Sequence, residues 1–237
     1  MSNDFSVLNI GKPQSLVDQI YRTLSRAIIN AEIMPGQMLT ETDLQASFSV
    51  SRGPIREAIR LLEADGLVVG DSYKKKYVRR ITLGDIEKIV PVMACLEGLA
   101  GKLAVGFLTD EKIEQMVKIN EKMKVNYTKK NIKKCIELNF KFHKIFVMNA
   151  NNKFLIKAIR SLIKPSMWVL LTRVYFGNEE LIPRSVDEHC KITDLFKKRD
   201  ANSIQLEIIN HVSNILNTYI KPSLFDADGN YIISLQS

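Results

Sequence analysis

The segment from residue 51 to residue 66 constrains the fold of this chain most, because it marks both ends of a helix. Its sequence is SRGPIREAIRLLEADG. Ser51 is placed to cap the N-terminus through its hydroxyl, Pro54 fits the first turn, and Gly66 supplies the left-handed residue that closes the helix. Apolar residues at three- and four-residue spacing predict one buried face, formed by Ile55, Ala58, Ile59 and Leu62.

A second face of this helix is basic. Arg52, Arg56 and Arg60 are four residues apart and lie away from the apolar face. A short helix of this kind suits the major groove of DNA, where arginine pairs with guanine edges or with phosphates. The alternative is an ordinary amphipathic helix with a solvated basic face. The helix alone leaves both interpretations open.

The flanking segments favour DNA binding. Residues 39–48 predict a shorter helix, in which Thr40 and Asp43 have the spacing of a capping box, and only two residues separate it from the basic helix. Downstream, two β-prone runs at 67–69 and 77–81 flank a lysine-rich tip, which predicts a hairpin. A helix over 15–31 precedes these elements, after a loose arm at 1–13. Together they predict a winged helix-turn-helix.

This part of the chain resembles the N-terminal domain of GntR-type bacterial transcription regulators. The resemblance rests on Pro35-Gly36, on Leu39-Thr40-Glu41 and on the segments 51–58 and 62–68. It implies that Arg52 and Arg56 contact bases or phosphates, with Thr42 on the preceding helix nearby. It also implies that the hairpin tip approaches the minor groove. Many members carry glycine in that tip, where this chain has Lys74-Lys75-Lys76, and three lysines favour phosphate binding. The DNA-binding residues expected are Thr42, Ser51, Arg52, Pro54, Arg56, Arg60, Lys74 and Lys75.

Composition limits the class of protein. The chain has 237 residues, enough for two modest domains, with 46% hydrophobic and 25% charged residues, as in ordinary globular proteins. Its three cysteines are well separated, which argues against a disulfide framework or a cysteine zinc site. No signal core and no membrane-spanning run is present, so we expect a cytoplasmic protein. The net charge of +8 is compatible with DNA binding, but most of it lies outside the predicted winged helix.

Beyond residue 81 the pattern becomes helical. We expect a mainly α protein with a DNA-binding domain at 1–81 and an antiparallel α-helical bundle at 82–237 that ends in a loose C-terminal tail. Pro165 should kink or split the fourth helix of this bundle. The predicted helices cover residues 84–107, 110–127, 131–150, 153–175, 181–198 and 201–220.

The second domain contains all three histidines of the chain, His143, His189 and His211. Each shares a helix face with apolar residues, and Asn139 lies one turn before His143. Three neutral imidazoles that meet in one cavity would bind a divalent metal such as zinc or nickel. The alternative is that each histidine is a hydrogen-bonded core residue.

The bundle resembles the FCD ligand-binding domain of the FadR-like branch of the GntR family, whose metal site has an acidic residue four before a histidine and two later histidines. The resemblance implies metal binding by Asn139, His143, His189 and His211. Asparagine replaces the usual aspartate, so metal affinity should be lower, or the effector completes the coordination shell. Where many members carry an arginine, one turn before the position of Glu97, this chain has Met93. Arg173, Arg160, Arg184 or lysine residues are candidate substitutes that would bind an acidic effector.

These features predict a metabolite-responsive transcription regulator, a repressor that binds a palindromic double-stranded DNA operator as a homodimer. A small molecule, for which an organic acid is one candidate, would bind beside or on the metal and shift the population of domain arrangements. Two alternatives are a metal-free regulator with an apolar effector cavity and a three-histidine metalloenzyme. Against the enzyme, the only acid beside a ligand is Glu188, which points about 100° away from His189 on a helix.

Overall fold

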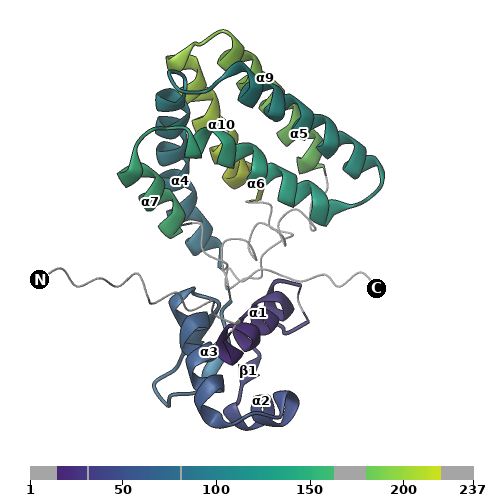
Figure 1. The fold of residues 1–237 in the computed structure, drawn as a ribbon, viewed down its shortest axis with the longest axis vertical. Coiled ribbons are helices and arrows are strands. Elements are labelled where there is room, and N and C mark those ends of the chain that lie inside the picture. Colours follow the sequence, from purple (N-terminus) through teal and green to yellow (C-terminus); the bar gives the residue numbers. More distant parts are fainter. Residues whose placement is uncertain (1–14, 31, 81, 163–179, 220–237) are drawn as a thin grey trace, which may run out of the picture. The chain divides into compact units, whose positions relative to one another are not determined.

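The computed structural model describes residues 15–30, 32–80, 82–162 and 180–219 of the chain. The predicted N-terminal arm, the kink at Pro165, the effector residue Arg173 and the C-terminal tail lie outside the described residues. The chain divides into two compact units, Met1–Arg79 and Arg80–Ser237. The first contains a small sheet and the second is helical (Figure 1), so the mainly α fold class is confirmed.

The first unit is a helix-turn-helix with a hairpin. Its elements in chain order are α1 (Leu16–Ile29), β1 (Met38–Leu39), α2 (Glu41–Phe48), α3 (Arg52–Ala64), β2 (Val68–Gly70) and β3 (Lys76–Val78). Helices α1 and α3 pack together. Their apolar faces supply most of the core, with Ile20, Leu24, Ile28, Ile55, Ala58, Ile59 and Leu62 all buried.

The helix ends follow the sequence signals, with one exception. The hydroxyl of Thr40 accepts a hydrogen bond from the Asp43 amide at 3.1 Å and begins α2. Ser49 ends α2 in the left-handed region at φ 53°, and Gly66 follows α3 at φ 70°. Ser51 occupies the N-cap position of α3 but makes no side-chain cap bond, so the predicted capping by its hydroxyl is wrong. The side chain of Ser51 is exposed to solvent instead.

The predicted hairpin is present and forms part of a three-stranded antiparallel sheet in the order β1-β3-β2. Val69 pairs with Tyr77 on one side of β3, and Met38 pairs with Tyr77 on the other. Strand β1 was not predicted from the sequence, since two residues are too few to show an alternating pattern. Gly36, at φ 81°, makes the turn before β1 and donates its amide to Val78.

The second unit consists of helices joined by short connections. The described helices are α4 (Leu83–Ala104), α5 (Asp110–Thr128), α6 (Ile132–Met148), α7 (Lys153–Leu162), α9 (Leu181–Lys197) and α10 (Ala201–Tyr219). A capping box of Thr82 and Asp85 begins α4. Lys130 and Arg199 take left-handed conformations in the turns between α5 and α6 and between α9 and α10. These tight turns bring successive helices back alongside each other (Figure 1).

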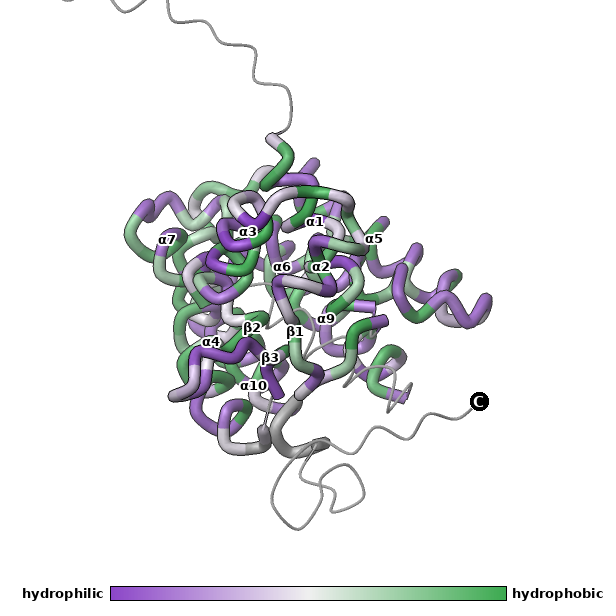
Figure 2. Tube along the Cα trace, turned by 90° about the horizontal axis from the view of Figure 1, so that it is seen from below, coloured by the Kyte–Doolittle hydropathy of each residue, from purple (hydrophilic) through white to green (hydrophobic). Residues whose placement is uncertain are grey.

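Hydrophobic and hydrophilic residues alternate along the helices of both units (Figure 2), as expected of helices with one buried face. The bundle core is contiguous and includes the fully buried Phe142, Phe146 and Phe196. None of the described helices has the length and apolar character that crossing a membrane requires.

Two glycines let α4 and α10 approach closely. A Cβ atom on Gly98 would lie 2.9 Å from the Gln205 carbonyl oxygen, and one on Gly101 would lie 2.2 Å from Cδ1 of Ile208. Both distances are shorter than van der Waals contact, so side chains larger than hydrogen do not fit here without a shift.

Candidate functional site

Two exposed arginines of α3, Arg52 and Arg56, are hydrogen-bonded to side chains of α2. Arg52 donates from Nε to the Gln45 side-chain oxygen at 3.2 Å, and Arg56 donates from Nε to both carboxylate oxygens of Glu41 at 2.9 Å. Glu41 and Gln45 are one turn apart on α2, as Arg52 and Arg56 are on α3. The two contacts therefore form parallel links between the helices, and they orient both guanidinium groups.

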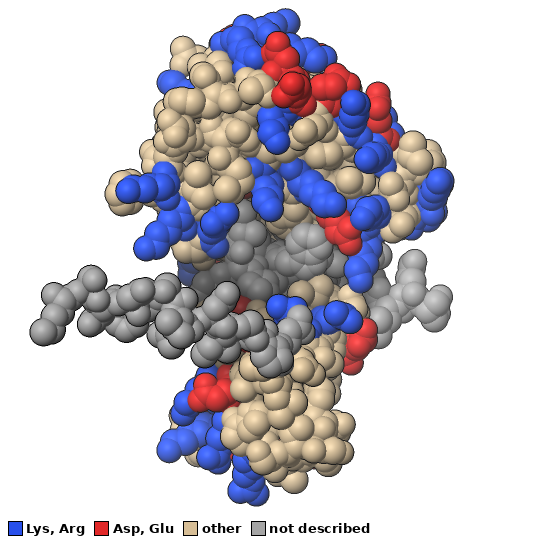
Figure 3. All heavy atoms as spheres, in the orientation of Figure 1, with Lys and Arg blue, Asp and Glu red and all other residues tan. Residues whose placement is uncertain are grey.

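These links leave the arginines available to a ligand. The side chains of Arg56 and Glu41 are 58% and 35% exposed, and ion pairs at such exposed positions are weak. Arg60 pairs with Glu57 on its own helix at 2.9 Å and is more exposed still. Thr42 and Ser51 are exposed and Pro54 is half-buried, all near the start of one of the two helices. Figure 3 shows lysine and arginine atoms gathered along one side of this unit.

The tip of the hairpin is organised by Asp71. One oxygen of its carboxylate accepts hydrogen bonds from the amides of Tyr73 and Lys75 at 2.9 and 2.8 Å. Lys74 takes the left-handed conformation at φ 61° that glycine adopts more easily. Lys74 and Lys75 are exposed. Lys76 instead lies in β3 and pairs with Glu63 at 2.5 Å, so the expected cluster of three free lysines contains only two.

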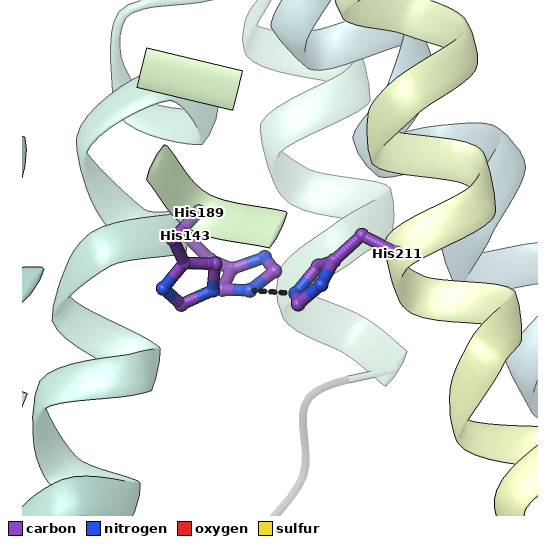
Figure 4. Close-up of side chains that lie close together, drawn as sticks. All are labelled: His143, His189 and His211. Atoms are coloured by element: carbon purple, nitrogen blue, oxygen red, sulfur yellow. Dashed lines mark hydrogen bonds between the residues drawn. The ribbon is translucent and has the colours of Figure 1, made fainter. Parts of the chain in front are cut away.

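In the second unit the structure brings the three histidines together. His143 comes from α6, His189 from α9 and His211 from α10, and one ring nitrogen of each lies within 4.8 Å of the others. Figure 4 shows the three rings side by side, with Nε2 of His143 3.1 Å from Nε2 of His211. The His189 ring stacks on Phe142, with the ring centroids 3.8 Å apart.

Each imidazole also makes a hydrogen bond through Nδ1, on the side of the ring away from the cluster. Nδ1 of His143 lies 2.5 Å from the Glu97 carboxylate, Nδ1 of His211 lies 2.7 Å from the Glu188 carboxylate, and Nδ1 of His189 lies 3.2 Å from the side-chain oxygen of Asn120. These oxygens accept hydrogen bonds, so each ring donates from Nδ1. A neutral ring then presents the Nε2 lone pair to the cluster, as metal-binding histidines do.

The surroundings of His189 and His211 favour the neutral form of these two rings. Burial, together with the charges of His211 and His143, lowers the pKa of His189 well below its ordinary value. Burial also lowers the pKa of His211, although its hydrogen bond to Glu188 opposes this effect. Burial raises the pKa of Glu188, but hydrogen bonds from His211, Asn214 and Arg184 outweigh it and hold that pKa below its ordinary value.

Unsatisfied polar atoms show that the cluster fits a cation. Nε2 of His189 and Oδ1 of Asn139 are buried and find no hydrogen-bond partner among the described residues. Leaving such an atom unpaired costs about 1–3 kcal/mol. Nε2 of His143 also lies 3.1 Å from Nε2 of His211, so these two ring nitrogens meet within the cluster. Three imidazole nitrogens and an amide oxygen are suitable ligands for zinc or nickel, so the residues present fit a divalent metal.

The residues expected at an effector site are only partly described. Met93 is buried on α4, one turn before Glu97, and brings no charge to the cluster. A hollow of about 240 Å³ lies between the end of α5 and the start of α9, and none of the three histidines lines it.

The sequence did not predict the hydrogen-bond partners of the three histidines, Glu97, Asn120 and Glu188. Glu97 was noted only as a family position, and Glu188 was set aside because it points away from His189, whereas it contacts His211 on the next helix. Asn120 was not identified. A signal for it exists, because it is a polar residue among the buried positions Ile113, Met116 and Met123 of α5.

Comparisons with known proteins agree with both units. The model of the FCD domain matches residues 88–214, and the model of bacterial regulatory proteins of the gntR family matches residues 16–72. An uncharacterised HTH-type transcriptional regulator of Bacillus subtilis, YdhC, is 31% identical over 210 residues, which cover 86% of this chain and 91% of the relative. The HTH-type transcriptional repressor RspR of Escherichia coli K12 is 24% identical over 85% of this chain and 88% of its own length.

A solved structure supports the fold. The structure of McbR/YncC from Escherichia coli superposes with a TM-score of 0.65 at 20% sequence identity and covers 86% of this chain and 98% of that one. Two family models with adjacent matches and a relative above 30% identity agree with the helix-turn-helix and the bundle described above. The chain therefore belongs to the GntR family of bacterial regulatory proteins, carries an FCD domain, and is a transcription regulator.

Proposed function

We propose that this regulator is a metabolite-responsive repressor that binds a palindromic operator as a homodimer and holds a divalent metal at its effector site. Residues 1–81 would form the DNA-binding domain, and residues 82–237 the domain for effector binding and dimerisation. The observation that carries the metal assignment is the meeting of three Nε2 atoms, each on a ring fixed through Nδ1.

For the DNA-binding domain, the exposed and oriented arginines of α3 support entry of this helix into the major groove. Arg52 and Arg56 are one turn apart, so both can reach base edges or phosphates from one side of the helix. Thr42, Ser51, Pro54 and Arg60 would lie at the edge of the contact, and Lys74 and Lys75 would bind phosphates. Relatives named as repressors, RspR among them, support repression.

For the bundle, Asn139, His143, His189 and His211 would hold zinc or nickel. Glu97, Asn120 and Glu188 keep the three rings in the orientation that binding requires. A bound divalent ion would supply a positive charge at which an effector can bind. These ligands come from α6, α9 and α10, so occupancy of the site would fix the relative positions of three helices.

Dimerisation follows from the proposed operator. Two copies related by a two-fold axis present two α3 helices to successive major grooves and double the number of contacts. An effector that binds one arrangement of the subunits better than another changes the spacing of these helices. The metalloenzyme alternative does not agree with membership of a regulator family, and the metal-free regulator remains as an outcome of the metal measurements.

The DNA assignment is tested by operator affinity. Operator DNA can be selected from a random pool with the wild-type protein, and its binding measured by fluorescence anisotropy at several salt concentrations. Arg52→Ala should lose about 1–3 kcal/mol of specific binding if Arg52 reads a base. Arg160→Ala removes the same charge from an exposed position on α7 and serves as the matched control. Equal operator affinity of the two variants would refute the assignment.

The metal assignment is tested by titration of nickel into metal-free protein. His143→Ala should lose nickel binding and keep its helical circular dichroism, whereas Lys144→Ala, which changes an exposed neighbour, should bind like the wild type. Unchanged nickel binding by His143→Ala would show that the three histidines do not form the site.

A further inference from the structure

We propose that the bundle has its own DNA-contacting surface, a basic face of α6 and α7 that binds the phosphates of DNA flanking the operator. This α6–α7 basic surface consists of five exposed residues, Lys141, Lys144, Lys153, Lys157 and Arg160. The proposal rests on the proposed binding of an operator by the first unit, and it adds contacts from the second unit that do not depend on the base sequence.

The five cations form one continuous surface. The two on α6 are three residues apart, and the three on α7 follow at spacings of four and three residues, so each group lies on one side of its helix. Arg160 connects the two groups, because its Nη2 donates to Sδ of Met148 at 3.3 Å, and Met148 is exposed one turn after Lys144. Figure 3 shows lysine and arginine atoms over the α7 side of the bundle.

This surface lacks compensating acidic side chains. The sequence contains no Asp or Glu between Glu137 and Glu179, and none of the five cations pairs with a carboxylate among the described residues. Other cations on the surface of the bundle pair with an acid on the next turn, as Lys134 does with Glu137 and Arg184 with Glu188. Clustered like charges repel each other and weaken a compact fold. A bound polyanion removes this repulsion.

DNA is the polyanion that the chain itself brings within reach of this surface. Strand β3 ends at Val78 and α4 begins at Leu83, so only residues 79–82 connect the two units. Four residues span at most about 14 Å, and DNA bound to the first unit is therefore present at a high effective concentration for the bundle. Weak phosphate contacts become significant under these conditions. Each cation that neutralises a phosphate releases counterions, whatever the base sequence.

An anionic membrane suits this surface less well. The apolar side of α7 is buried in the bundle through Leu155 and Ile159, which leaves Phe154, 76% exposed, as the exposed large apolar residue of this helix. Nζ of Lys153 also lies 5.3 Å from the centre of the Phe154 ring. Helices that lie in a membrane surface bind through an extended apolar face. One aromatic ring among five cations favours contacts with phosphates over insertion into lipid.

The experiment measures the binding of full-length protein to two duplexes. The short duplex is the selected operator alone. The long duplex adds unrelated flanks of about 15 bp, or about 50 Å, on both sides of the same operator. Affinities are measured by fluorescence anisotropy at several salt concentrations.

Two triple variants remove equal charge from different surfaces. The surface variant combines Lys141→Gln, Lys153→Gln and Lys157→Gln. The control variant combines Lys118→Gln, Lys122→Gln and Lys191→Gln at exposed positions of α5 and α9. Glutamine and lysine have similar helix propensities, so both variants should fold and bind the short duplex like the wild type. Arg160 belongs to the proposed surface, so Arg160→Ala is a control for Arg52→Ala on the short duplex only.

For the wild type and the control variant, the flanks should strengthen binding at low salt. Three phosphate contacts add about 2.7 to the steepness of log affinity against log salt, so the gain from the flanks should shrink about 40-fold between about 50 and about 200 mM salt. The surface variant should lose most of the gain and most of the additional salt dependence.

The possible results separate the proposed surface from the proposed operator binding. If the flanks strengthen binding of the wild type and the surface variant equally, or of neither, the basic surface does not contact DNA and operator binding by the first unit stands. If the wild type, but not the surface variant, sediments with phosphatidylglycerol vesicles and the flanks have no effect, the surface binds lipid and the proposal is overturned. If the wild type binds the short duplex no better than an unrelated duplex, operator binding is refuted, and the proposal with it.

Discussion

Replacing Gly98 with alanine should damage both the stability of the bundle and its metal site, because this glycine sets the distance between α4 and α10. The added Cβ would lie 2.6 Å from Cγ1 of Ile209 and 2.9 Å from the carbonyl oxygen of Gln205. The isoleucine side chain can rotate, but the carbonyl belongs to the α10 backbone. Reaching an ordinary contact distance of 3.4 Å requires the helices to separate by about 0.5 Å.

The size of the effect follows from this separation. Overpacking of a well-packed core costs about 1–3 kcal/mol. Gly84→Ala is the matched control, since it lies on the same helix and its Cβ would meet only Thr82 Oγ1, at 3.8 Å. Both substitutions gain up to about 1 kcal/mol of helix propensity, so their difference reports mainly the strain. We expect Gly98→Ala to be less stable than Gly84→Ala by about 1–3 kcal/mol in urea unfolding.

Metal affinity should change as well. The proposed ligand His211 lies on α10, and Glu97 on α4 orients the ligand His143. Metal–ligand distances tolerate errors of only about 0.2 Å. A helix shift of about 0.5 Å exceeds that tolerance, so Gly98→Ala should bind nickel more weakly than Gly84→Ala does. Equal unfolding free energies and equal nickel affinities of the two variants would refute the reasoning about this helix contact.

Three further perturbations should give defined results. Because the pKa of His189 lies well below its ordinary value of 6.5, the unfolded state takes up a proton first as the pH falls below 6.5. The unfolding free energy of the metal-free protein should then drop by up to about 1.4 kcal/mol for each pH unit below 6.5 on account of this histidine. His189→Gln should remove that part of the dependence of stability on pH. An unchanged pH dependence in this variant would contradict the burial argument. Arg199 donates to the carbonyls of Val105 and Leu108 and pairs with Asp110 at 2.6 Å. Arg199→Ala should therefore lower the unfolding free energy in urea by about 1–3 kcal/mol. A loss no larger than that of Arg160→Ala would show that these contacts do not stabilise the bundle. Lys74→Gly should leave stability unchanged or raise it by up to about 1 kcal/mol, and should lower the slope of log affinity for DNA against log salt by about 1; an unchanged slope would show that Lys74 does not bind phosphate.

The sequence predicted the first unit well, because its signals are local. The Thr40 cap, Gly66 and the apolar positions of α3 each act within a few residues, and the structure has them where the sequence placed them. Two local features were not predicted correctly. Strand β1 is too short to show a pattern, and Ser51 has the residue type of a cap without making its bond.

The second unit shows why partners are harder to predict than elements. The positions of the histidines on apolar helix faces predicted which residues form the cluster. Whether the three rings come together depends on how α6, α9 and α10 pack. The hydrogen bonds to Glu97, Asn120 and Glu188 join residues 46, 69 and 23 positions away in the chain. No periodicity encodes such pairs. The close contact at Gly98 is similar, since the glycine is visible in the sequence and the carbonyl that requires it is not.

The most direct test of this account is the metal content of the purified wild-type protein, measured by native mass spectrometry and elemental analysis together. The account predicts one divalent metal for each chain, and loss of that metal in His143→Ala. A wild-type protein that stays metal-free after incubation with zinc or nickel would contradict the account. The three histidines would then be core residues of a metal-free regulator.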